Sequence, residues 1–159
     1  MLLAVLTVSD RCSQGLLTDT AGPAVVALLT RRWPQAEFWT GLVPDDEDLI
    51  AATLEKLSLQ GAALVLTVGG TGMGPRDRTP EATRRILDRE APGLAEAMRS
   101  LGSSSNPFAW LSRGVAGLKG GTLIINLPGS KRGAEESLSS ILSLLEHALE
   151  VAAGGQAHP

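Results

Sequence analysis

One stretch of the sequence, Gly69 to Asp77, has a composition suited to binding a phosphate group. Its glycines allow successive backbone N–H groups to converge on an anion, and a helix is predicted to begin just after it, at Thr79. The stretch lacks the Gly-Lys-Ser/Thr ending of a P-loop and the full glycine spacing of a dinucleotide-binding turn. A plain strand-to-helix turn would need fewer glycines, so we favour ligand binding over a purely structural turn.

Acidic residues also follow the predicted strands, at Asp10, Asp45, Asp46 and Asp77. Carboxylates beside a phosphate site would repel the phosphate unless a cation joins them, and Mg²⁺ is usually held by one or two carboxylates together with substrate phosphates. A helix cap or Asx turn explains Asp46 better and is possible for Asp45. It explains Asp77 less well, because Thr79 is the better cap candidate.

Other polar side chains near these positions could contact a ligand or serve only local turns and solvent. The hydroxyl candidates are Ser9, Ser13, Ser112 and Ser130, and the basic candidates are Arg76, Arg78, Arg113, Lys119, Lys131 and Arg132. Neither His147 nor His158 suggests a general base, which argues against a Ser-His-Asp hydrolase. Cys12 is the only cysteine, so a disulfide or a zinc cluster of cysteines cannot form within one chain.

The hydrophobic pattern predicts a scaffold that brings these residues to one edge of a sheet. Apolar runs predict strands, and apolar residues at helical spacing predict helices. The expected strands are 2–8, 37–43, 62–68, 113–118 and 122–127, and the expected helices are 20–32, 46–60, 79–88, 92–101 and a last one through 138–149. This alternation predicts a three-layer α/β/α domain with a mainly parallel mixed sheet. Ligands bind beyond the carboxyl ends of such strands, where four loops should meet: 9–15, 44–46, 69–77 and 126–130.

The composition indicates one ordinary globular domain. The 159 residues are 43% hydrophobic and 19% charged, and we expect a single domain over 1–153 with a flexible tail at 154–159. The net charge of −3 and the 3% aromatic content argue against a nucleic-acid partner. The apolar run at 1–6 is too short to span a membrane and is expected to form a core strand. We expect a cytoplasmic location.

Several ordered motifs together give the chain a resemblance to a known family. They are Thr7-Val8-Ser9-Asp10-Arg11 with Ser13, Gly15, Asp19 and Gly22, then Val43-Pro44-Asp45-Asp46, Leu66 to Gly72 with Pro75 to Thr83, Leu111-Ser112-Arg113, and Ile125-Asn126-Leu127-Pro128-Gly129-Ser130. Over nearly its whole length the chain resembles the MogA/MoaB family of molybdenum-cofactor biosynthesis proteins. Where that family often has Pro then Lys after the Pro-Gly-Ser segment, this chain has Lys131 and Arg132.

The resemblance implies a reaction in which the terminal phosphate of molybdopterin attacks the α-phosphate of ATP, giving adenylylated molybdopterin and pyrophosphate with Mg²⁺. It implies that Asp45 and Asp77 are catalytic, and we expect the same two acids to hold the metal. The binding residues that it implies, together with those expected from the loops, are Ser9, Asp10, Gly69, Gly70, Thr71, Gly72, Arg76, Thr79, Ser112, Pro128, Gly129 and Ser130. Such a transfer depends on positioning and charge neutralisation more than on a protein nucleophile.

The resemblance also implies a homotrimer and a downstream protein that inserts molybdenum into the product. Within the family, a MoaB-type protein that binds or carries molybdopterin without adenylylating it is the alternative function. The presence of both Asp45 and Asp77 favours the enzyme. A scaffold module of the kind found in larger proteins is a weaker third interpretation.

Overall fold

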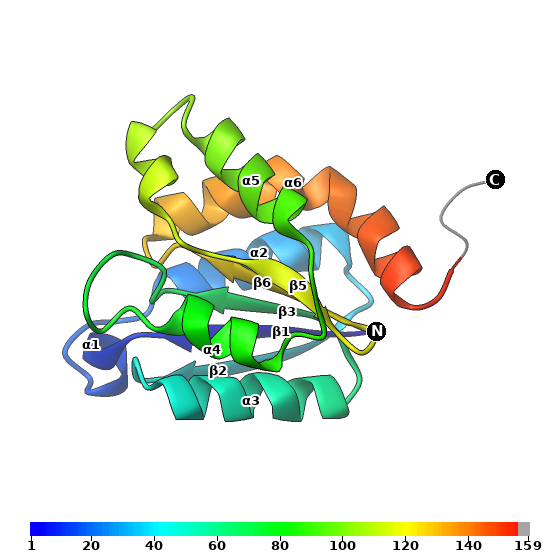
Figure 1. The fold of residues 1–159 in the computed structure, drawn as a ribbon, viewed down its shortest axis with the longest axis horizontal. Helices are drawn as coiled ribbons and strands as arrows, with labels where there is room; N and C mark the ends of the chain where they lie inside the picture. The colour runs from blue at the N-terminus through cyan, green and yellow to red at the C-terminus, as the bar shows by residue number, and fades with distance from the viewer. Residues whose placement is uncertain (156–159) are drawn as a thin grey trace.

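The computed structural model describes residues 1–155 and contains one sheet of six strands with helices on both faces (Figure 1). The strands are β1 Leu2–Val8, β2 Glu37–Val43, β3 Ala62–Val68, β4 Arg89–Glu90, β5 Ala116–Lys119 and β6 Thr122–Leu127. The helices are α1 Asp10–Ser13, α2 Ala21–Arg32, α3 Glu47–Leu59, α4 Thr79–Ile86, α5 Pro92–Gly102 and α6 Lys131–Ala152, with a 3-10 helix η1 at Pro107–Leu111. The predicted three-layer α/β/α fold is confirmed.

The order of the strands brings the expected loops to one edge of the sheet. The order is β2-β1-β3-β6-β5-β4, in which β2, β1, β3 and β6 are parallel. The hairpin partner β5 is antiparallel to β6, and β4 is antiparallel to β5. The four parallel strands therefore end at the same edge, and the segments that follow them meet there.

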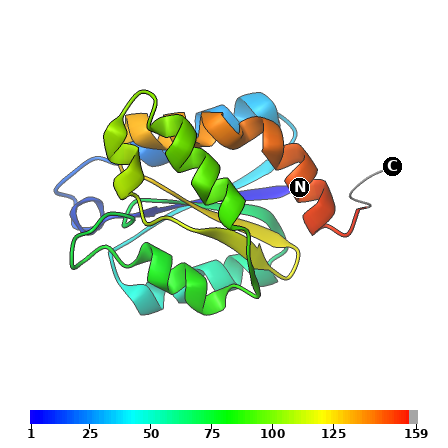
Figure 2. The ribbon, with the colours of Figure 1, turned by 45° about the horizontal axis from the view of Figure 1, so that its top comes forward.

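Alternate residues of the central strands pack against different helix layers. Leu3 and Val5 of β1 belong to a core cluster with α2, α5 and α6, whereas Ala4 and Leu6 belong to a cluster with α3 and α4. Figure 2 shows these two helix layers on opposite sides of the sheet. Burial on both faces explains why β1 and β3 are continuous apolar runs rather than alternating ones.

The helix starts agree in part with the predicted caps. Asp46 caps α3 as expected, because its Oδ1 accepts a hydrogen bond from the N–H of Leu49 at 2.8 Å. At α2 the cap comes from Asp19, whose Oδ1 accepts from the N–H groups of Ala21 at 3.1 Å and Gly22 at 2.9 Å. The N-cap residue Thr20 makes no side-chain cap bond.

Several short elements differ from the expectation. The 9–15 segment contains the helical turn α1 instead of being only a loop, and α4 ends at Ile86, two residues early, because Leu87 has an extended ψ of 136°. Strand β5 begins at Ala116 rather than 113. The two-residue strand β4 was not expected, since it forms only through pairing of Arg89 and Glu90 with β5.

Within residues 1–155 no helix combines the length and the apolar character needed to cross a bilayer. Of the expected tail at 154–159, Gly154 and Gly155 follow α6, while residues 156–159, including His158, lie outside the described residues.

Candidate active site

Two adjoining pockets lie beyond the carboxyl ends of the parallel strands. The first, of about 580 Å³, lies among the ends of β1 and β3, helix α1 and the starts of α2 and α6. The second, of about 510 Å³, lies among the 70–77 loop, η1 and the first turns of α6. Both have the size of small-molecule sites, about 300–1,000 Å³. They share Gly70, Asp77, Gly129 and Ser130, which form the junction between them.

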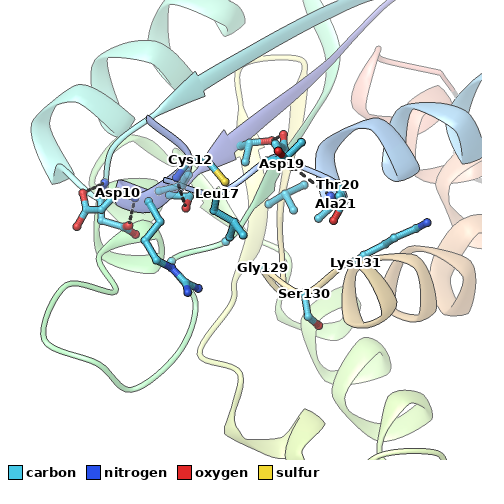
Figure 3. A pocket seen from close by; sticks show the side chains of 18 of the residues that line it. Asp10, Cys12, Leu17, Asp19, Thr20, Ala21, Gly129, Ser130 and Lys131 are labelled. Carbon is cyan, nitrogen blue, oxygen red and sulfur yellow. Dashed lines mark hydrogen bonds between the residues drawn. The ribbon is translucent and has the colours of Figure 1, made fainter. Parts of the chain in front are cut away.

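The first pocket is acidic on one side and has a helix N-terminus on the other. Figure 3 shows Asp10 at the α1 side and Ser130 with Lys131 at the start of α6. Ser130 caps α6, because its Oγ accepts from the N–H of Gly133 at 3.1 Å. The N–H groups of a first helical turn have no intrahelical acceptor and favour an anion, so the α6 side suits a phosphate.

Asp10, Asp45 and Arg76 form one linked cluster at the ends of β1 and β2. The backbone N–H groups of Asp10 and Asp45 each donate to the carboxylate of the other, at 2.9 and 3.0 Å. The Nε and Nη2 of Arg76 both donate to the Asp10 carboxylate at 3.0 Å. The hydrogen bond from Arg76 lowers the pKa of Asp10. This pair ties the 69–77 loop to the end of β1.

The pKa of Asp45 is raised above its ordinary value. Burial is the main cause, and the negative charges of Asp10 and Asp77 act in the same direction, while the hydrogen bond from the Asp10 N–H opposes them. An acid whose charge is disfavoured by burial and by two other acids is typical of a cation-binding or catalytic position.

Asp77 bonds back into its own loop. Its Oδ2 accepts from the N–H of Gly74 at 2.8 Å, and its own N–H donates to the Gly74 carbonyl at 3.0 Å. Asp77 is half-buried and lines both pockets. The loop geometry therefore places this carboxylate at the junction between them.

The start of the loop passes very close to the neighbouring backbone. Gly69 and Gly70 have φ values of 109° and 65°, and a Cβ on Gly69 would lie 2.2 Å from the Val8 carbonyl oxygen. Only glycine fits this positive-φ, close-packed path without strain. The loop floor is thus held against the end of β1.

Thr79 bonds to the start of the 69–77 loop. Its predicted role as the N-cap of α4 is wrong. The N-cap residue is Arg78, which makes no side-chain cap bond. The Thr79 hydroxyl is fully buried and donates to the Gly69 carbonyl at 2.9 Å, and the Thr79 N–H donates to the Gly70 carbonyl at 3.1 Å. The Thr79 hydroxyl therefore bonds to a carbonyl of the preceding loop and does not accept a hydrogen bond from the N–H groups of α4.

Twelve of the fourteen expected site residues line one or both pockets. The first pocket has Ser9, Asp10, Asp45, Gly69, Gly70, Asp77, Gly129 and Ser130. The second has Gly70, Thr71, Gly72, Asp77, Ser112, Pro128, Gly129 and Ser130. Arg76 and Thr79 line neither pocket. Arg76 bonds to the Asp10 carboxylate, and the buried Thr79 bonds to the Gly69 carbonyl.

Most of the basic candidates form ion pairs with carboxylates of the protein and do not line the pockets themselves. Lys131 is the one of these six that lines either of the two pockets, the first. The pairs of the other five are Arg76 with Asp10, Arg78 with Glu47, Arg113 with Glu81, Lys119 with Asp88 and Arg132 with Glu136, and of these partners Asp10 lines the first pocket and Glu136 the second. Of the hydroxyl candidates, Ser13 lines neither pocket and donates to the Asp10 carbonyl.

Sequence reasoning missed lining residues in both pockets. Asp19 lines the first, where its Oδ2 accepts from the Thr7 hydroxyl at 2.6 Å, and its place in the family motif with Ser9 and Asp10 was the available signal. Phe108 and Leu111 of η1 add an apolar wall to the second. A signal for η1 existed in Asn106-Pro107, because Asn is a good N-cap and Pro suits the first helical position. The Asn106 Oδ1 does accept from the Phe108 N–H at 3.1 Å.

Comparison with known proteins finds consistent similarity. A family model described as a probable molybdopterin binding domain matches residues 4–147. The chain is 36% identical over 154 residues to a molybdopterin adenylyltransferase of Helicobacter pylori, covering 96% of this chain and 88% of that protein. A crystal structure of the molybdopterin biosynthesis enzyme MoaB from Thermus thermophilus matches with a TM-score of 0.90 and 48% identity, covering 99% of both chains.

Some relatives are much longer than this chain. The chain is 40% identical over 148 residues to the molybdenum cofactor synthesis protein cinnamon of Drosophila melanogaster, covering 92% of this chain but 25% of that protein. It spans 47% of a molybdenum cofactor biosynthesis bifunctional protein of Synechococcus elongatus.

Proposed function

Because the chain belongs to the MogA/MoaB family of molybdenum-cofactor biosynthesis proteins, we propose that it is a molybdopterin adenylyltransferase. The proposed reaction joins the terminal phosphate of molybdopterin to the α-phosphate of ATP and releases pyrophosphate. Three proteins that carry this name, from Helicobacter pylori, Haemophilus influenzae and Escherichia coli, are 36%, 40% and 39% identical to this chain.

The observation that carries the proposal is the junction of the two pockets. A transfer between two phosphorylated substrates requires two binding sites that meet where the phosphates react. The two pockets meet at Gly70, Asp77, Gly129 and Ser130. In this proposal the start of α6 and Lys131 attract the phosphates, and the walls of the two pockets hold the rest of each substrate.

The acids at the junction suit Mg²⁺ binding. Asp45 and Asp77 each have one oxygen, Oδ2, committed to a backbone N–H. Their Oδ1 atoms accept no hydrogen bond from the described part of the chain, so each can bind a cation. No three His, Cys, Asp or Glu side chains converge on a metal within residues 1–155. That is compatible with Mg²⁺, which takes one or two carboxylates and completes its shell with phosphate and water oxygens.

The proposed roles of the residues follow from these positions. Asp45 and Asp77 would hold the cation, and the chemistry that Mg²⁺ supplies when bound is neutralisation of charge developing on the transferred phosphate. The 69–72 backbone and Ser130 would orient the reacting phosphates. No protein nucleophile takes part, because the molybdopterin phosphate is itself the nucleophile.

The direct test is to incubate the pure protein with molybdopterin and MgATP and to measure pyrophosphate and adenylylated molybdopterin. We expect both products in equal amounts. Tight molybdopterin binding without either product would instead support the MoaB-type carrier function.

The proposal also includes a homotrimer, a cytoplasmic location and transfer of the product to a molybdenum-insertion protein. All three rest on the resemblance to the family and not on contacts in a single chain. Light scattering of the purified protein would test the trimer.

A further inference from the structure

We propose that Arg113 is a positioning residue that holds the Asp77 loop in its working shape. The proposal rests on the adenylyl transfer proposed above, because it assigns Arg113 a part in that reaction through Asp77. Arg113 was a candidate phosphate contact in the sequence, but its contacts point to the loop instead.

The side chain of Arg113 contacts the loop on both sides of its exposed segment, at Gly72 and at Asp77. Its Nε donates to the Gly72 carbonyl at 2.7 Å, and its Nη2 donates to the Asp77 carbonyl at 2.7 Å. Its backbone N–H also donates to the Thr71 carbonyl at 2.9 Å. The segment between these anchors, Met73 to Arg76, is exposed. One residue from elsewhere in the chain therefore fixes the two ends of the exposed segment that precedes Asp77.

Arg113 is itself held in place from two sides. Its Nη1 forms an ion pair with the Glu81 carboxylate on α4. Burial is the largest influence on Glu81 and disfavours its charge, but the hydrogen bond and the charge of Arg113, together with a backbone hydrogen bond and the charge of Arg78, keep the pKa of Glu81 below its ordinary value. On the other side, the Nη1 of Arg99 donates to the carbonyls of Ser112 at 3.3 Å and Gly114 at 3.0 Å, the two residues that flank Arg113.

Arg113 acts through the loop and not on a substrate. It lines neither of the two pockets that meet at Asp77. It lines a separate cavity of about 350 Å³ on the α5 side, together with Arg99. Its guanidinium is occupied by the loop carbonyls and Glu81, so no part of it is directed at the junction.

The geometry requires arginine rather than a generic cation. The planar guanidinium presents several N–H donors in a rigid fork, which reaches two carbonyls and a carboxylate at once. A lysine ammonium on its flexible stem can satisfy only part of this set. A misplacement of about 1 Å at a reacting centre can lower a rate about 100-fold. Loss of the Arg113 contacts with the loop should therefore act mainly on kcat.

The experiment compares Arg113→Lys with two controls in the full chain. Arg85→Lys makes the same chemical change on α4, where Arg85 pairs with the exposed Asp48 and with Glu47, outside the loop. Leu57→Ala lowers the melting temperature through the α3 core, far from the junction. Each variant is assayed for kcat and KM, for melting temperature, and for hydrogen exchange of the 71–78 backbone by mass spectrometry.

We expect Arg113→Lys to lower kcat about 10- to 100-fold while KM for MgATP changes less than about threefold. Exchange of the 71–78 backbone should be faster than in the unaltered protein. Arg85→Lys should retain kcat and normal loop exchange. If Arg113→Lys does not fold, Glu81→Gln, which removes the charge that anchors Arg113, should show a smaller fall in kcat with faster loop exchange.

Three results would overturn the proposal. One is unchanged kcat in Arg113→Lys, and another is a fall in kcat with unchanged loop exchange. The third is an equal loss of kcat in Leu57→Ala, measured well below its melting temperature. If the unaltered protein makes no adenylylated product, the proposed function fails and the loop exchange of Arg113→Lys alone decides whether Arg113 holds the loop.

Discussion

The backbone N–H of Asp10 donates to Asp45 Oδ2 at 2.9 Å, and the backbone N–H of Asp45 donates to Asp10 Oδ1 at 3.0 Å. This exchange joins the ends of β1 and β2, two segments 35 residues apart in the chain. It leaves Asp45 Oδ1 on the side of Gly70, where a Cβ added to Gly70 would lie 3.0 Å from it. The uncommitted oxygen of Asp45 therefore lies beside the glycine loop and the pocket junction.

Asp77→Asn is expected to abolish adenylyl transfer while leaving molybdopterin binding mostly intact. The amide keeps the shape of the side chain and can still accept from Gly74, but it loses the charge that attracts Mg²⁺. We expect the rate to fall about 100-fold or more. The measurements are pyrophosphate release and equilibrium binding of molybdopterin. Full turnover by this variant would remove Asp77 from the proposed metal site.

Asp45→Asn is expected to stabilise the free protein at neutral pH, although it should lose most of its activity. The pKa of Asp45 is raised in the folded state, mainly by burial, so its ionised form weakens folding. This penalty is fully present above the folded pKa and is relieved as the pH falls towards the unfolded value near 3.8.

The stability gain of Asp45→Asn should therefore fade as the pH falls through the raised folded pKa of Asp45, and should be lost below about 4. Asp45 is only half-buried, so solvent screening should keep the gain under about 1 kcal/mol. Denaturant unfolding of both proteins at pH 7 and pH 3.5 measures the difference. A gain that grows on acidification would have the wrong sign for a raised pKa.

Mg²⁺ dependence should change when one of the two proposed ligands is lost. A chelator should stop the reaction, and added Mg²⁺ should restore it. In any residual activity of Asp45→Asn, the Mg²⁺ concentration for half-maximal rate should rise about tenfold or more. Asp48→Asn is the matched control, because Asp48 pairs with Arg85 outside the pockets. Equal Mg²⁺ requirements in the two variants would contradict the assignment of Asp45.

Gly69→Ala is expected to destabilise the fold by more than about 2 kcal/mol. The added Cβ would lie 2.2 Å from the Val8 carbonyl oxygen, and φ is 109°. Gly120→Ala is the control, because Gly120 has a φ of 56° with nothing within 4 Å of the added Cβ. In Gly120→Ala the free energy of unfolding should fall by about 1–2 kcal/mol, because only the strain of the positive φ is added. Thermal or urea unfolding compares them, and equal losses would mean that the contact with β1 is not restrictive.

The regular elements that support the site were predictable because local patterns encode them. The apolar runs of β1 and β3 mark strands buried on both faces, and the apolar spacing in α3 and α6 marks their core faces. The positions of the loops after β1, β2, β3 and β6 then follow, because parallel strands end at one edge of a sheet. Most of the family motifs fall on these same loops, whereas Leu111-Ser112-Arg113 lies between the end of η1 and β5.

Directions of side chains were not predictable, because they depend on partners far away in the sequence. Arg113 contacts Gly72 and Asp77, which are 41 and 36 residues away, and Arg76 contacts Asp10 over 66 residues. No local propensity distinguishes these arginines from phosphate ligands. Strand β4 likewise exists only through its pairing with β5.

Short-range patterns were enough to predict which loops meet and which acids they carry, since hydrophobic periodicity and strand direction are properties of short segments. The three-dimensional contacts were needed to show that hydrogen bonds from three side chains hold the 69–77 loop in place. Thr79 bonds to the start of the loop at Gly69, and Arg76 bonds to Asp10 just after β1. Arg113 bonds to Gly72 and Asp77, on either side of the exposed segment. Such contacts cannot be read from local patterns, because a polar side chain bonds to the acceptors that the fold places within its reach, and the packing of the whole chain sets which acceptors those are.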